Sequence, residues 1–312
     1  MRFHPCLRGL FFAAVLARGA AQSEQISLAG VIDFHAHSAP DTVSRSLNSF
    51  AVVRDARAAG MRALVLKNHF APTAALAQLA MSEIGGFEVY GGIVLNRAVG
   101  GLNAEAVRRM TQVEGHRGKI VWLPTFDAEN QVKFSHEDRP FVSVVKDGKP
   151  VPALAEIFLL CVENDLILAT GHSAPAESII LLEAAKQAGV KRLLVTHVLS
   201  ESTRATIEQM KKMAALGATM ECVYLAHLGG IAGPVPTTRA SKTLPVSACA
   251  RAIQTVGAEH FLISSDLGQP NNPVHTAGLR AFIAALKAEG VTDRELALVT
   301  RENPARLLGL AP

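Results

Sequence analysis

Eight short apolar segments run along the chain, and most are separated by amphipathic stretches. The apolar segments are continuous rather than alternating, which is typical of strands buried on both faces of a sheet. They cover residues 30–37, 62–69, 87–96, 118–125, 165–172, 191–197, 217–224 and 260–266. The clearest amphipathic stretches carry a helix start signal, a C-terminal glycine, or both, and they cover residues 49–60, 174–189 and 200–217.

Strand alternating with helix eight times predicts an α/β fold of the (β/α)8 TIM-barrel type. A doubly wound open sheet is the alternative, but it would need a glycine-rich phosphate turn after the first strand. The first strand here ends in His-Ala-His. Two connections, residues 126–153 after strand four and 225–245 after strand seven, are too long for plain turns. In a barrel both would lie at the C-terminal face, where substrates bind, and the first contains a predicted hairpin that turns at Asp147-Gly148.

The first residues follow a different pattern. Arg2 and Arg8 precede a short apolar stretch at residues 10–17, and small residues follow it up to Ala21. This pattern predicts a secretory signal peptide over residues 1–21, and therefore a periplasmic or secreted protein with one domain over residues 22–312. The apolar stretch is too short to span a membrane. If the segment is instead a translated upstream extension, the protein is cytoplasmic.

Composition excludes some classes of partner. The chain is 49% hydrophobic and 19% charged, which is ordinary for a globular protein, and its net charge of +4 is mild. Aromatic residues make up only 5%, and no Lys/Arg run is interleaved with them, so neither nucleic-acid binding nor a membrane partner is predicted. A small-molecule substrate remains as the expected partner, and homo-oligomerisation is left open.

Histidine and aspartate residues recur at the ends of the predicted strands. His35 and His37 are two residues apart in strand one, so they project from the same face. Strands five, six and eight end at His172, His197 and Asp266. A single His-x-His would be interpreted as structural, but in a barrel all five residues meet at one rim.

Such a set of nitrogen and oxygen ligands suits a divalent metal that keeps one position open for water. Zinc is the first expectation, with Mn or Fe as alternatives, and one or two ions are allowed.

The five residues, in this order, resemble the motif of the amidohydrolase superfamily of TIM-barrel metal-dependent hydrolases. The tail "NPARLLG" at residues 303–309 is similar to the closing helix of that superfamily. Further segments, such as "VLKNH" and "SSDLGQ", suggest one of its less characterised branches.

One departure from the superfamily pattern concerns the bridging residue. Members with two metals commonly bridge the ions with a carboxylated Lys or a Glu on strand four, and strand four here ends without either. One metal therefore follows more naturally. Lys67, at the end of strand two, has three open roles: a carboxylated bridge, a cation that contacts substrate, or a partner for an acid at the rim. His69 shares the face of Lys67 and is an extra ligand, a substrate contact or a structural residue.

Further polar residues at the predicted rim suit contacts with a polar substrate. Each one taken singly is more often structural than functional. These tentative substrate residues, besides His69, are Asn96, Thr125, Asp127, Glu221, Tyr224 and Gln269.

The resemblance implies a hydrolase in which a metal-activated water attacks an amide, ester or lactone bond of a small molecule. Asp266 would take the proton and pass it to the leaving group, while His197 or Lys67 would stabilise the oxyanion. The alternatives are a metal-dependent decarboxylase, a TatD-like phosphodiesterase and a non-catalytic metal-binding protein. The phosphodiesterase ranks lower because the strand-four Glu and a basic stripe are absent from the sequence.

Overall fold

The strands of a computed structural model, which describes residues 26–228 and 243–311, form one eight-stranded parallel sheet. Its order is β1-β2-β3-β4-β7-β8-β9-β10, so neighbours in the sheet follow one another in the chain. The strands are β1 (Ile32–Ala36), β2 (Ala63–Leu66), β3 (Glu88–Val94), β4 (Gly118–Trp122), β7 (Ile167–Ala169), β8 (Arg192–Val195), β9 (Thr219–Val223) and β10 (Phe261–Ser264). All eight lie inside the segments predicted from sequence, and the predicted (β/α)8 barrel is confirmed.

The sheet closes on itself at the C-terminal ends of its first and last strands. The Asp266 amide donates to the His35 carbonyl at 2.8 Å, and the His37 amide donates to the Leu267 carbonyl at 2.9 Å. On its other edge, β1 pairs with β2, and a register shift between Asp33 and Ala36 marks an irregularity in that pairing. The residues that close the barrel are thus the predicted metal ligands or their immediate neighbours.

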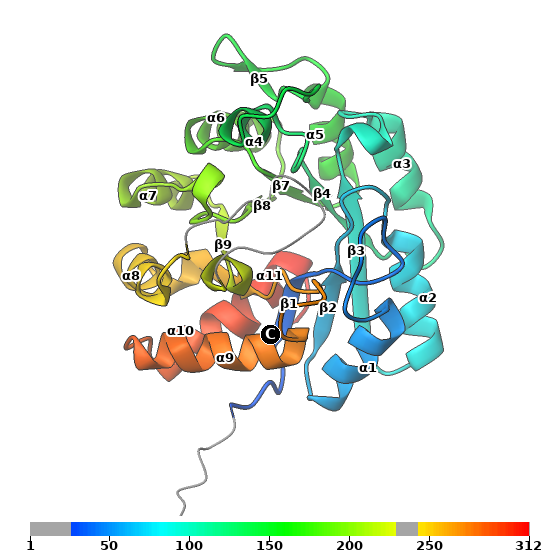
Figure 1. Ribbon diagram of the computed structural model, residues 1–312. Helices are drawn as coiled ribbons and strands as arrows, with labels where there is room; N and C mark the ends of the chain where they lie inside the picture. The colour runs from blue at the N-terminus through cyan, green and yellow to red at the C-terminus, as the bar shows by residue number, and fades with distance from the viewer. Residues whose placement is uncertain (1–25, 229–242, 312) are drawn as a thin grey trace, which may run out of the picture.

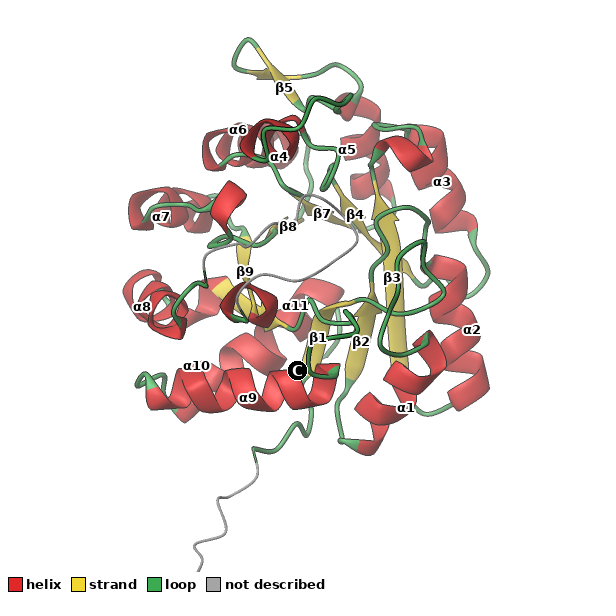
Figure 2. Ribbon diagram, viewed as in Figure 1, coloured by secondary structure: helices red, strands yellow, loops and turns green. Residues whose placement is uncertain are grey.

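Helices surround the strands, as Figures 1 and 2 show. They are α1 (Ser49–Ala58), α2 (Ala74–Ile84), α3 (Ala104–Gln112), α4 (Glu129–Phe134), α5 (Leu154–Glu163), α6 (Pro175–Gln187), α7 (Ile207–Ala215), α8 (Val246–Val256), α9 (His275–Ala288), α10 (Asp293–Ala297) and α11 (Asn303–Leu308). Short 3₁₀ turns occur at Arg97–Val99, Glu201–Thr203, Tyr224–His227 and Ala258–His260, and a π-helical turn at Leu298–Glu302. The stretch predicted as one amphipathic segment over residues 200–217 is divided, because Thr206 and Gln209 form a capping box that starts α7.

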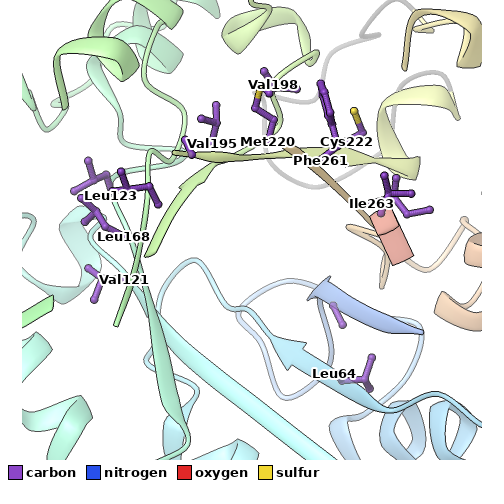
Figure 3. Close-up of a cluster of buried hydrophobic side chains, with 14 of the residues drawn as sticks. Leu64, Val121, Leu123, Leu168, Val195, Val198, Met220, Cys222, Phe261 and Ile263 are labelled. Carbon is purple, nitrogen blue, oxygen red and sulfur yellow. The ribbon is translucent and has the colours of Figure 1, made fainter. Parts of the chain in front are cut away.

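Two apolar cores hold the barrel together. The larger one packs the outer faces of the strands against the helices, and Figure 3 shows part of it on β2, β4 and β7 to β10. The smaller one fills the barrel interior around Phe34 and Trp122. Helix α11 supplies Leu307 and Leu308 to this inner core, and Asn303 donates to the carbonyls of Ala258 and Phe261 at 2.8 and 2.6 Å. The tail thus covers the N-terminal end of the barrel.

The long connection after β4 contains α4 and a hairpin of β5 (Val145–Lys146) and β6 (Lys149–Pro150). Its turn is at Asp147-Gly148, as predicted, and the hairpin projects from the barrel in Figure 1. The predicted signal peptide and most of the long loop after β9, residues 229–242, lie outside the described residues. Within the described ranges no helix is long and apolar enough to cross a membrane.

Candidate metal centre

Three buried side chains converge at the C-terminal end of the barrel. His35 comes from β1, His197 follows β8 and Asp266 follows β10, and one ligand atom from each lies within 4.8 Å of the other two. The Nε2 atom of His35 is 3.1 Å from Asp266 Oδ1, and that of His197 is 3.5 Å from Asp266 Oδ2. Two ligand atoms bound to one tetrahedral zinc at about 2.1 Å lie about 3.4 Å apart, so these separations fit shared coordination.

A left-handed backbone conformation directs two of these side chains toward the centre of the cluster. His197 and Asp266 have φ angles of 51° and 54°, in the left-handed region that residues other than glycine rarely adopt. Each lies two residues beyond the end of its strand, so the chain turns sharply where the side chain leaves the sheet. Strained backbone of this kind clusters at functional sites, where the surrounding structure holds it in place.

A divalent cation would fit the nitrogen atoms of the cluster. His37 Nδ1 donates to the Lys67 carbonyl at 2.9 Å, and burial lowers the pKa of His37 well below its ordinary value, so its Nε2 is a bare acceptor. That Nε2 faces Asp266 Oδ1 at 3.0 Å. A protonated Asp266 would satisfy one such nitrogen, but the Nε2 atoms of His35 and His197 are also buried and lack aligned hydrogen-bond partners among the described residues. One proton cannot serve three nitrogens, whereas a divalent metal can bind several.

Outer residues orient the histidines. Glu221 on β9 places its carboxylate 3.3 Å from His35 Nδ1, and Gln131 on α4 places its amide oxygen 3.1 Å from His172 Nδ1. Such partners fix the ring so that Nε2 is presented to a metal. His172 Nε2 is buried and has no hydrogen-bond partner in residues 26–228 and 243–311, and its ring centre is 5.1 Å from that of His197. His172 therefore borders the three-residue cluster rather than belonging to it.

The main chain at Gly171 positions His172. Its φ is +62°, and a Cβ atom there would lie 2.2 Å from the Leu123 carbonyl oxygen and 2.3 Å from that of Pro124. This close approach allows the His172 amide to donate to the Pro124 carbonyl at 2.9 Å.

We expect Gly171→Ala to lower the free energy of unfolding by about 2–4 kcal/mol, because it combines left-handed strain with a backbone clash. Gly217→Ala is the matched control: its φ is +87° but no atom lies within 4 Å of the added Cβ, so about 1 kcal/mol is expected. Urea denaturation of both variants measures the difference. Equal losses would show that the clash at Gly171 is relieved without cost.

Lys67 and His69 line the same end of the barrel. The Lys67 ammonium is buried, lies 5.3 Å from the centre of the Trp122 ring and has no hydrogen-bond partner among the described residues. His69 Nδ1 is 2.9 Å from Thr125 Oγ1, and its ring stacks on Phe126 and on His37.

Burial controls the charges of the site. It lowers the pKa of His35, His69 and His197 well below the ordinary value, and that of His172 to about 3, so all four are neutral and able to act as ligands. Burial also raises the pKa of Asp266 to about 7, that of Glu221 to about 8, and lowers that of Lys67 to about 8. Two carboxyl groups thus titrate near neutral pH, as expected at a functional site.

The other tentative substrate residues are mostly engaged by the protein itself. Asn96 donates to the His69 carbonyl and to Thr125 Oγ1, and accepts from the Thr125 amide. Asp127 forms an ion pair with Arg139 at 2.6 Å. Gln269 donates to the Asp266 carbonyl at 3.0 Å. The Tyr224 ring packs 5.4 Å from that of Phe282.

Sequence reasoning did not single out some residues that shape the site. Asp33 accepts from the amide and hydroxyl of Ser265, at 2.9 and 2.5 Å, and so fixes the turn into Asp266. Asp33 is two residues before His35 and so shares the face of His35 and His37 on the strand, which could have identified it from the sequence. Gln131 and Phe126 lie in the long connection after β4, where no periodic pattern marks them.

The structure is thus a TIM barrel with a buried His/His/Asp group at the C-terminal end of its strands. A family model described as a family of unknown function, DUF6282, matches residues 30–221, and the chain belongs to this family. No curated protein shows significant similarity to it.

Several solved structures share the fold. An organophosphorus hydrolase from Deinococcus radiodurans is 14% identical with a TM-score of 0.57, and the match covers 91% of this chain and 93% of that one. A candidate 2-pyrone-4,6-dicarboxylic acid hydrolase from Acinetobacter baumannii, with citric acid bound, is 13% identical with a TM-score of 0.59, covering 90% and 100%. A 2,6-dihydroxybenzoate decarboxylase from Rhizobium is 11% identical with a TM-score of 0.53, covering 90% and 99%. At these identities the matches establish the fold.

Proposed function

We propose that this protein is a metal-dependent hydrolase of the amidohydrolase superfamily, and that it cleaves an amide, ester or lactone bond of a small molecule with a metal-activated water. One observation carries the proposal: three buried imidazole Nε2 atoms, of His35, His37 and His197, lie around one Asp266 carboxyl that cannot satisfy them all.

The ion would be held by His35, His197 and Asp266. His37 and His172, which border this group, would be further ligands. Zinc is the first choice, and Mn and Fe also accept this ligand set. A bound divalent cation makes a water molecule more acidic and polarises the bond to be cleaved.

Asp266 would move the proton. A carboxylate beside the metal suits the role of a group that accepts a proton at one step and returns it at the next. It would take the proton of the attacking water at a carboxylate oxygen and deliver it to the leaving nitrogen or oxygen. Glu221 would keep the His35 ring fixed, and the barrel wall around Trp122 would exclude bulk water.

Decarboxylation is the second candidate. The Lys67 ammonium lacks a hydrogen-bond partner in the described ranges, and a substrate carboxylate beside the metal would supply one. The same metal centre would then stabilise charge on the remaining fragment instead of activating water.

The test is metal content per chain, measured for the wild type, His35→Ala and the control Asp165→Asn after supplementation with Zn, Mn or Fe. Asp165 pairs with Arg192 at the opposite end of the barrel. We expect about one ion in the wild type and in the control, and a clear loss in His35→Ala. The loaded protein is then assayed on ester, amide, lactone, phosphodiester and aromatic-acid panels. Absence of metal in the wild type would overturn the proposal.

A further inference from the structure

Lys67 is a buried cation whose ammonium no described residue satisfies by a hydrogen bond. The residue is 2% exposed, and its ammonium, which has three donor hydrogens, has no hydrogen-bond partner in the part of the chain that the structure describes. The Trp122 ring, 5.3 Å away, offers it a π face but no acceptor. A buried ammonium without a hydrogen-bonded anion is costly, so an anionic ligand that contacts it would be favoured here.

Lys67 is adjacent to the metal centre. His37 Nδ1 donates to the Lys67 carbonyl, and the Lys67 amide donates to the Ala36 carbonyl between the two strand-one histidines. The charges of Asp266 and Glu221 act on the ammonium electrostatically, but neither carboxyl is hydrogen-bonded to it. The nearby acids are directed to histidines instead.

Arg45 brings a second positive charge to the same end of the barrel. It lies in the loop after β1, its side chain is 5% exposed, and its Nε and Nη2 both contact Asp41 Oδ2 at 2.7 Å. Its charge still acts on His37, Lys67 and Asp266. Asp41 offsets the Arg45 charge by this ion pair, so the Lys67 ammonium is the cation of the site that has no hydrogen-bonded anion among the described residues.

We propose that the substrate carries a free carboxylate, which binds the Lys67 ammonium while the bond to be cleaved lies at the metal, and that Arg45 favours the same anion from the loop after β1. The inference rests on the proposed function and narrows it to organic acids. A carboxylated Lys67 would make the opposite prediction, because an anionic carbamate repels a carboxylate.

Matched hydroxamates test the inference by binding alone. The hydroxamate group occupies the metal centre, and the far end of the probe is either a carboxylate or a methyl group. The monohydroxamates of malonic, succinic and glutaric acid are compared with their methyl-ended counterparts on the zinc-loaded protein by calorimetry. We expect at least one acid to bind at least tenfold more tightly than its counterpart in the wild type.

Variants assign the preference to residues. Lys67→Met should remove the preference for the acid while leaving the affinity for the methyl-ended probes within about threefold, and Lys67→Arg should restore part of it. Arg45→Gln should reduce the preference without removing it. Equal affinity of both probe types in the wild type would overturn the inference and leave the hydrolase intact. Failure of both probe types to bind would instead count against the metal centre itself.

Discussion

Asp266→Asn should lower kcat/KM by about 10³, which corresponds to about 4 kcal/mol of transition-state stabilisation. The substitution keeps the size of the side chain but removes the group that accepts and returns the proton. It also replaces one anionic ligand of the metal, so weaker metal binding is expected. The measurement is kcat/KM on whichever ester, amide or lactone the wild type cleaves, with metal content determined on the same samples.

The metal-free form of this variant gives an independent readout. The amide nitrogen introduced at this position would donate to the bare Nε2 of His35 or His37, which lie 3.1 and 3.0 Å from Asp266 Oδ1. The melting temperature without metal should therefore be equal to or above that of the wild type, whereas the stabilisation on adding zinc should shrink. Full activity with full metal content in Asp266→Asn would contradict the assignment. Asp165→Asn, at the other end of the barrel, should retain both.

Metal affinity should fall about tenfold per pH unit as the pH is lowered below about 7. Burial raises the pKa of Asp266 to about 7, and a metal must displace the proton that the carboxyl carries below that pH. The histidines do not add to this slope near neutrality, since burial keeps their pKa values well below 6.5. Competition with a chromophoric chelator at pH 6.0, 6.5, 7.0 and 7.5 measures the slope.

The raised pKa of Asp266 also determines how the stability of the metal-free protein changes with pH. The folded pKa of Asp266 is above its unfolded value of 3.8, so its contribution to the metal-free fold is present below about pH 4 and is lost as the pH rises through about 7. Metal loading removes that penalty, so the gain in melting temperature on adding zinc should increase between pH 6 and 7.5. Asp266→Asn should flatten both dependences. A pH-independent affinity in the wild type would show that Asp266 is ionised throughout.

The order and type of the main elements could be predicted from the sequence because local pattern determines them. All eight predicted strands are present, and the hairpin turns at Asp147-Gly148. The point within residues 200–217 at which the helix begins could not be predicted, since the start of α7 depends on hydrogen bonds between Thr206 and Gln209.

The candidate site could also be predicted only in part. The sequence shows which residue types stand at the strand ends, but it does not show which distant side chains contact them. His35 meets Glu221, and His172 meets Gln131, across 186 and 41 residues. Asn96 was predicted to contact substrate, but its side-chain amide donates hydrogen bonds to Thr125 and His69 instead.

By itself, then, the sequence determined the barrel and the ring of histidines and aspartate at its C-terminal end, because period and strand-end position are local properties. Only the tertiary structure decided that His35, His197 and Asp266 form the closest group and that His172 borders it. It also decided that the buried Lys67 ammonium has no hydrogen-bond partner in the described part of the chain. The physical reason is that these properties depend on left-handed turns at two strand ends and on whether distant side chains fill each hydrogen-bonding position.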